Sequence, residues 1–184
     1  MQGIIFNALE EFVLENASME VWNDVLEASK VESGGAYTAG ISYKDEEIVA
    51  LATALCNILE LSLNDGLKVF GEYLFEFLLN KGPIELQEYG SAQKLLVEIE
   101  DVVHRDVKRV HPEAYTPLFE YTPKTEDSGT LTYLSKRKLC IVAEGLLTGA
   151  AKHYGQTVTM KHTQCMHDDF DKCIWDVNFS LISE

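Results

Sequence analysis

The residues best suited to hold a charged ligand lie together in the stretch YLSKR, Tyr133 to Arg137. In an extended chain alternate side chains point the same way, so Tyr133, Ser135 and Arg137 would line one face as three hydrogen-bond donors. A phenol, a hydroxyl and a guanidinium suit carboxylate or phosphate oxygens, which arginine can bind through two parallel hydrogen bonds. Lys136, on the opposite face, would point to solvent. The alternative is that the three donors form only the solvated face of an antiparallel strand.

A second candidate is His104, within a helix expected from Ser91 to His111. At about 100° per residue, His104 falls at one edge of the apolar stripe of this helix, between Val97 and Val107 in angular order. An imidazole in that position can reach into a pocket. The alternative is a histidine at the edge of the core whose hydrogen bonds are satisfied within the protein. His111 is expected to cap the carboxyl end of the helix.

A third set contains His162, Cys165 and Cys173 in the spacing H-x2-C-x7-C, with Cys140 farther upstream. Three thiolates and one imidazole match a closed tetrahedral zinc site with a structural role, since no position is left for a substrate water. His167 is a further candidate ligand. The alternative is that the cysteines are isolated thiols without a metal.

Two kinds of structure must position these residues, because the pattern of apolar residues changes after Pro112. The spacing predicts helices over 3–14, 19–28, 45–59, 63–80, where Lys81-Gly82-Pro83 is a stop signal, and 91–111. It predicts strands over 118–121, 130–135, 157–161 and 173–182, and a helix over 140–154 that ends at Gly155. The expected fold class is therefore α+β, with a helical amino-terminal part joined to a four-stranded antiparallel sheet.

The composition limits the classes of partner. A chain of 184 residues with 46% apolar content is long enough to bury one core. Its formal net charge of −15 would repel nucleic acid and anionic membrane surfaces. The longest apolar stretch, 48–63, is interrupted by Asn57 and Glu60 and falls short of the roughly 18 residues that a membrane helix needs.

The start of the chain and the cysteines bear on its location. The amino terminus, MQGIIFNALEEFVLE, lacks the basic leader of a signal peptide. We therefore expect a cytoplasmic protein whose four cysteines are reduced thiols or metal ligands. Cys56 lies on an apolar helix face and is expected to serve packing alone.

The order and spacing of these motifs resemble the H-NOX family, the haem nitric-oxide/oxygen-binding domains related to the haem domain of soluble guanylate cyclase. The resemblance covers nearly the whole chain through the M-x-G-I-I-F start, VVHRDVKRVHPE, YLSKR and CIVAEGLLTGAAKHY. It implies one domain over 1–184, with a distal helical part (1–60), a proximal helix and sheet part (61–184), and haem b between them. The chain is identified as a bacterial stand-alone member of the zinc-containing kind.

The resemblance also implies roles for the candidate residues. His104 would be the proximal ligand of the haem iron, and Tyr133, Ser135 and Arg137 would bind the haem propionates. Burying two carboxylates in a protein of net charge −15 is costly, and a charge-assisted bond from Arg137 would offset part of that cost.

The haem pocket that the resemblance implies is apolar. Ile5 and Pro112 match family positions that press on the porphyrin and distort it, and Leu9 and Leu74 match pocket positions. Oxygen-binding relatives carry a tyrosine nine residues after the tyrosine of the motif, where this chain has Val142. Bound O2 is stabilised by a hydrogen-bond donor, whereas NO binds ferrous haem tightly without one. The expected activity is NO sensing without stable oxygen binding, with CO as a second ligand.

Signalling would follow from release of His104, because NO weakens the bond opposite it. Freeing the helix that carries His104 would relax the haem and shift the helical part relative to the sheet, a change that a partner can read. Bacterial single-domain relatives usually regulate a histidine kinase or a cyclic-di-GMP enzyme. The domain itself is not expected to be an enzyme.

The zinc set has a place in the same resemblance, since some bacterial members carry a Cys/His zinc site near the carboxyl terminus. Cys140, His162, Cys165 and Cys173 match that site, which would be structural or would open on thiol oxidation. The alternatives to a haem sensor are a zinc-containing redox or NO sensor module, a zinc enzyme that uses this cluster, and a haem-free interaction module. For the enzyme, no open coordination position or general base is visible.

Overall fold

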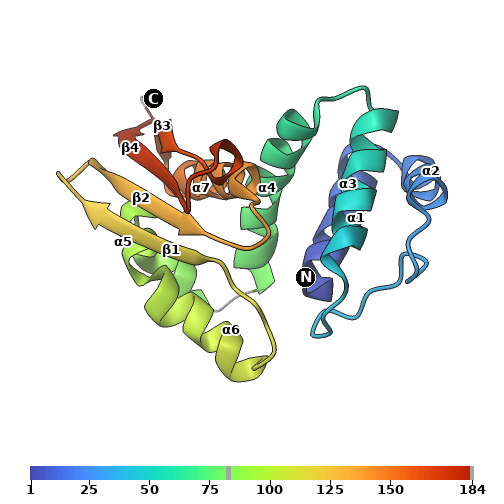
Figure 1. Cartoon of the computed structure of the whole chain (residues 1–184). Coiled ribbons are helices and arrows are strands. Elements are labelled where there is room, and N and C mark those ends of the chain that lie inside the picture. Colours follow the sequence, from blue (N-terminus) through green and yellow to red (C-terminus); the bar gives the residue numbers. More distant parts are fainter. Residues whose placement is uncertain (82–83, 183–184) are drawn as a thin grey trace.

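The structure is a computed structural model that describes residues 1–81 and 84–182 (Figure 1). The helices of the first part are α1 (Gly3–Asn16), α2 (Met19–Ser29), α3 (Asp45–Ile58) and α4 (Leu63–Lys81). A 3-10 helix, η1 (Ile84–Tyr89), follows α4. The predicted helices are confirmed to within a few residues, while Gly82 and Pro83, expected to stop α4, lie outside the described residues.

The strands form the predicted four-stranded antiparallel sheet. They are β1 (Leu118–Pro123), β2 (Ser128–Leu134), β3 (Gln156–Gln164) and β4 (Cys173–Leu181), in the order β1-β2-β4-β3. The helix α7 (Cys140–His153) and the short 3-10 helix η3 (Met166–Asp168) lie between these strands in the chain. In the register of the sheet, Tyr133 of β2 lies between Phe119 of β1 and Cys173 of β4. The α+β fold class is therefore confirmed.

The core has two parts, which share α4 and α7. On one side, α1, α2 and α3 enclose Phe6, Leu51 and Phe70; on the other, the sheet packs on Leu147. Figure 1 shows α4 and α7 between the amino-terminal helices and the sheet. The expected boundary near residue 60 precedes α4, and α4 contributes to both parts.

Glycines allow α4 and α7 to approach until their backbones touch. A Cβ atom at Gly145 of α7 would overlap the backbone oxygen of Lys68, and one at Gly71 of α4 would overlap that of Val142. The two helices could move apart only by disrupting the packing of both parts of the core. Glycine is therefore required at these two positions, because it has no Cβ atom. This contact holds Val142 of α7 against α4.

The segment 91–111 differs from the single regular helix that the spacing predicted. It consists of α5 (Ala92–Glu98), a π-helical stretch η2 (Ile99–His104) and α6 (Arg105–Val110). In η2 the N–H of Arg105 bonds to the carbonyl of Glu100, five residues back. A π-helix has more residues per turn than an α-helix, so an angle of 100° per residue misplaces His104. The apolar stripe also ends early, because Val110 is 65% exposed.

The ends of this segment are capped as expected. The Ser91 hydroxyl accepts a hydrogen bond from the N–H of Lys94, which fixes the start of α5. His111 is the capping residue after α6, and its ring lies against Gly40 of the loop before α3. Within 1–81 and 84–182, no helix is both long enough and apolar enough to cross a membrane.

Candidate functional site

His104 lies at the end of η2 with its two ring nitrogens in different situations. Its Nδ1 is 2.7 Å from Glu100 Oε1, and the same oxygen accepts the backbone N–H of Phe119 at 2.8 Å. Because a carboxylate accepts, Nδ1 carries the proton and Nε2 presents its lone pair. Among the described residues, the hydrogen bonding of the His104 ring involves Nδ1 alone. The ring is therefore oriented by the protein and keeps one free ligand atom.

The surroundings of His104 favour the neutral imidazole. Its side chain is only 12% exposed. Burial lowers the pKa of His104, and the nearby Glu100 charge opposes that shift. The ring also packs near Phe119, at 6.1 Å between ring centroids. A neutral, partly buried imidazole is the form that binds a metal.

The three donors of the YLSKR stretch span the end of β2 and the turn after it. The strand ends at Leu134, so the expected strand over 130–135 is one residue shorter at this end. Tyr133 and Ser135 are each only 3% exposed. The solvated-strand alternative is therefore wrong for these two residues. Burial raises the pKa of Tyr133 to about 12, which keeps its phenol protonated as a donor.

Arg137 reaches from this turn to the amino-terminal helices. Its Nε donates to Asp45 Oδ1 at 2.8 Å and its Nη1 to the carbonyl of Tyr115 at 3.0 Å. The guanidinium also lies over the Tyr115 ring, 4.7 Å from its centroid. Asp45 in turn accepts the amino group of Met1 at 2.6 Å. The described residues give Nη2 of Arg137 no partner, so part of the guanidinium fork remains able to bind an anion.

The predicted pocket residues fall into two groups. Leu9, Leu74 and Val142 are 1%, 3% and 9% exposed in the core of the amino-terminal helices, and Ile5 is partly buried against them. Pro112 is exposed beyond the end of α6. The apolar set thus belongs to one part of the core, while Tyr133 belongs to the other.

This set of side chains fits a haem. The His104 imidazole could bind iron, the Tyr133 and Ser135 hydroxyls and the Arg137 guanidinium could donate to propionates, and Leu9, Leu74 and Val142 would be the apolar neighbours. Axial histidine, propionate donors and an apolar surround are the elements by which proteins hold this cofactor. The fit rests on the chemistry of the donors and on the free Nε2 of His104.

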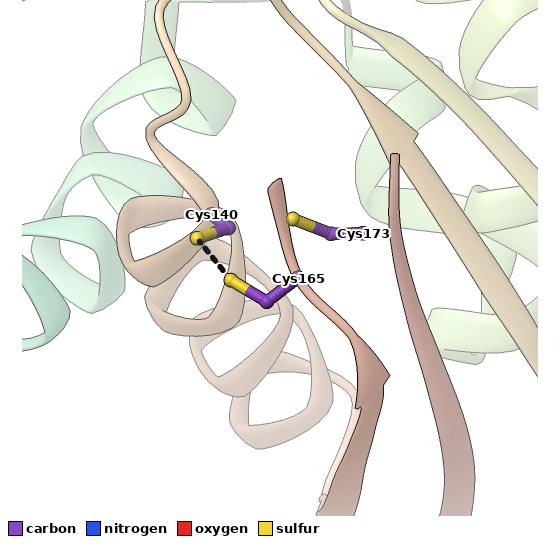
Figure 2. Close-up of side chains that lie close together, drawn as sticks. All are labelled: Cys140, Cys165 and Cys173. Atoms are coloured by element: carbon purple, nitrogen blue, oxygen red, sulfur yellow. Dashed lines mark hydrogen bonds between the residues drawn. The ribbon is translucent and has the colours of Figure 1, made fainter. Parts of the chain in front are cut away.

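A separate cluster of thiols lies where α7 meets β3 and β4 (Figure 2). The sulfur atoms of Cys140, Cys165 and Cys173 all lie within 4.8 Å of one another, with Cys140 and Cys165 separated by 4.0 Å. Burial, followed by the neighbouring Cys173 and Cys165 thiols, raises the pKa of Cys140. Cys56 lies apart, buried on α3, as expected for a packing residue.

His162 lies outside the group of three sulfurs. Its ring stacks on Trp175 at 4.5 Å, and its Nδ1 is 3.4 Å from Glu144 Oε1, which also accepts the indole N–H of Trp175 at 2.8 Å. Its Nε2 is buried and has no hydrogen-bond partner among the described residues. His167, the other candidate, has its Nε2 2.8 Å from the Lys138 carbonyl.

Sequence reasoning missed two carboxylates that orient the candidate ligands. Glu100 lies four residues before His104, and Glu144 four residues after Cys140. Glu100 could have been found from the sequence, because residues four apart in a helix lie one turn apart and their side chains can meet. Glu144 contacts His162 and Trp175 across separate elements, so no local spacing reveals it.

Comparisons with known proteins identify the family of the chain. A sequence model of the family described as haem-NO-binding matches residues 2–162. An H-NOX protein from Shewanella oneidensis, solved in the Fe(II)NO ligation state, is 32% identical; the match covers 98% of this chain and 99% of that chain with a TM-score of 0.90. An unliganded Fe(II) H-NOX protein from K. algicida is 26% identical over 98% of this chain and 97% of that chain, with a TM-score of 0.86.

A curated relative is longer than this chain. The soluble guanylate cyclase gcy-35 of Caenorhabditis elegans is 22% identical over 182 residues, which are 93% of this chain and 26% of the relative. The chain therefore spans about a quarter of the length of that relative.

Proposed function

The chain belongs to the haem-NO-binding family, and from this premise we propose that it senses nitric oxide at a ferrous haem held by His104. The observation that carries the proposal is the state of His104: its Nδ1 is engaged by Glu100 at 2.7 Å, and among the described residues the hydrogen bonding of the ring involves Nδ1 alone. Tyr133, Ser135 and Arg137 are proposed to hold the propionates.

When bound, the haem would supply a ferrous iron able to bind NO, with His104 as the proposed protein ligand. The apolar Leu9, Leu74 and Val142 surround the NO site in the proposal and offer no hydrogen-bond donor. NO needs none, whereas bound O2 does. The proposed ligands are accordingly NO and CO, without stable oxygen binding. NO and CO are the ligands named for the Shewanella oneidensis structures.

His104 is the proposed moving part. If NO binding broke a bond between His104 and iron, η2 would be free to shift. Arg137 and Asp45 join the turn after β2 to the start of α3 and would transmit that shift between the two parts of the core. Ile5 and Pro112 are proposed to contact the porphyrin. We propose a protein partner as the output, either a histidine kinase or a cyclic-di-GMP enzyme.

The thiol cluster supports a second, separate proposal of a structural zinc site. Three sulfur atoms within 4.8 Å of one another could bind one metal ion, and thiolates are preferred zinc ligands. Cys140, Cys165 and Cys173 would bind zinc, and the buried, unpartnered Nε2 of His162 is the proposed fourth ligand after the ring turns toward the sulfurs. Oxidation of the thiols would release the zinc, and reduced thiols agree with a cytoplasmic location.

The test of the main proposal is the absorbance spectrum of the purified ferrous protein with and without NO. We expect a strong Soret band that shifts when NO is added. His104→Ala should lose the iron–histidine bond, and the matched variant His111→Ala, in a histidine seven residues along the same segment, should keep it. A preparation without a Soret band, from cells supplied with haem precursor, would overturn the proposal.

A further inference from the structure

One carboxylate oxygen connects the candidate iron ligand to the edge of the sheet. Glu100 Oε1 lies 2.7 Å from His104 Nδ1 and accepts the backbone N–H of Phe119 at 2.8 Å. Phe119 belongs to β1 and pairs with Tyr133 of the YLSKR stretch. The carboxylate is therefore held on one side by a strand and on the other by the imidazole.

The contact between Glu100 and His104 lies within the π-helical turn. Glu100 and His104 are the second and last residues of η2, and they face each other across its single wide turn. The Glu100 side chain is 26% exposed and that of His104 is 12% exposed, so water competes only weakly for their hydrogen bond.

We propose that Glu100 is a positioning residue for His104, which sets both the direction of its Nε2 and the strength of the bond that Nε2 makes to iron. This inference rests on the proposed function, because it requires His104 to be the iron ligand. A carboxylate that accepts the Nδ1 proton draws that proton toward itself and leaves more electron density at Nε2. The bond between His104 and iron is then stronger than that of an imidazole with a neutral acceptor.

The backbone N–H of Phe119 gives the carboxylate its second role. Because this N–H belongs to β1, the position of Glu100 is tied to the sheet rather than to η2 alone. Once His104 leaves the iron, its Nδ1 remains bonded to Glu100, so the freed imidazole stays near Phe119. Glu100 therefore governs how readily His104 is released by NO and where its ring goes.

The experiment compares Glu100→Gln and Glu100→Ala with the control Asp101→Asn in the haem-loaded protein. The control removes the same charge from an exposed neighbouring residue. The readout is the iron–histidine stretching frequency of the ferrous, ligand-free protein by resonance Raman spectroscopy. We expect the frequency to fall in Glu100→Gln, which retains a neutral acceptor, and to fall further in Glu100→Ala. Asp101→Asn should match the wild type.

A second readout follows release itself. In stopped-flow mixing with NO, loss of the iron–histidine bond should become about 10-fold faster or more in Glu100→Ala, because loss of the partner of a metal-bound histidine typically weakens metal affinity or activity about 10–100-fold. Should Glu100→Ala fail to fold, the smaller frequency shift of Glu100→Gln still decides the question.

The outcomes separate this inference from the function on which it rests. Equal frequencies in the wild type and Glu100→Gln would overturn the role of Glu100 while leaving His104 as the ligand. An equal shift in Asp101→Asn would also overturn it, because the effect would then come from charge in general. If the wild-type protein showed no iron–histidine stretching band at all, both the proposed function and this inference would be wrong.

Discussion

Arg137 Nε lies 2.8 Å from Asp45 Oδ1, although the two residues are 92 positions apart in the chain. The bond joins the turn after β2 to the first residue of α3, and the amino group of Met1 lies 2.6 Å from the same oxygen. The Arg137 side chain is 11% exposed and the Asp45 side chain is 34% exposed. This ion pair links the amino-terminal helices to the part of the chain that carries the proposed propionate donors.

Asp45→Asn should weaken the fold most at neutral pH. Burial raises the pKa of Asp45, but hydrogen bonds and charge from the Met1 amino group and Arg137 outweigh it, so the pKa is lowered from its ordinary 3.8. A lowered carboxyl pKa contributes stability above pH 3.8 that is lost as the pH falls through the folded value. We expect a loss of about 1–3 kcal/mol at pH 7 that shrinks below about pH 4. Denaturant titrations at both pH values measure it. Asp24 is exposed, and Asp24→Asn is the control. An equal loss of unfolding free energy in this control would show that the ion pair of Asp45 is not the cause.

Arg137→Gln should release haem faster than the wild type. The substitution removes the charge that would face the propionates and also breaks the bond to Asp45. Charge-assisted hydrogen bonds contribute about 1.5–3 kcal/mol, so haem transfer to apomyoglobin should accelerate about 10-fold or more. Lys136→Gln removes the same charge from the exposed neighbouring residue and should leave the transfer rate unchanged. Similar rates for the two variants would argue against a propionate role for Arg137.

The ferrous protein should form no long-lived oxygen complex in aerated buffer. Val142, Leu9 and Leu74 are buried and apolar and cannot donate a hydrogen bond to bound O2. The absorbance spectrum recorded over minutes after mixing with air measures this directly, and the same sample should still bind NO once air is removed and the iron is reduced. A stable oxy spectrum would show that another donor reaches the iron.

Cys173→Ser should lower the zinc content of protein purified under reducing conditions. Its thiol is one of the three whose sulfur atoms lie within 4.8 Å of one another, and the wild type should hold close to one zinc per chain. Cys56→Ser is the matched control, because Cys56 is equally buried but lies on α3. Elemental analysis of both variants gives the result. Zinc-free wild-type protein would dismiss the site.

The sequence by itself determined the types of element and the residues with chemical capacity. Apolar spacing is a local property, so it revealed the helices and strands, and the turn chemistry of Gly155, which has a φ of 68°, was also readable. The shared face of Tyr133 and Ser135 followed from the periodicity of an extended chain, whereas their burial was decided by the tertiary structure. The order and spacing of these motifs, which resemble those of H-NOX domains, then indicated the family.

Only the tertiary structure decided how those residues meet. The π-helical turn over 99–104 is invisible to a fixed angle per residue. The backbone N–H of Phe119, which Glu100 accepts at 2.8 Å, comes from a strand 19 residues along the chain. The bond between Arg137 and Asp45 depends on how the two parts of the core pack around α4 and α7. The separation of His162 from the three sulfurs depends on its stacking on Trp175 across the sheet. Contacts between distant segments are set by packing and strand register, which no local pattern encodes.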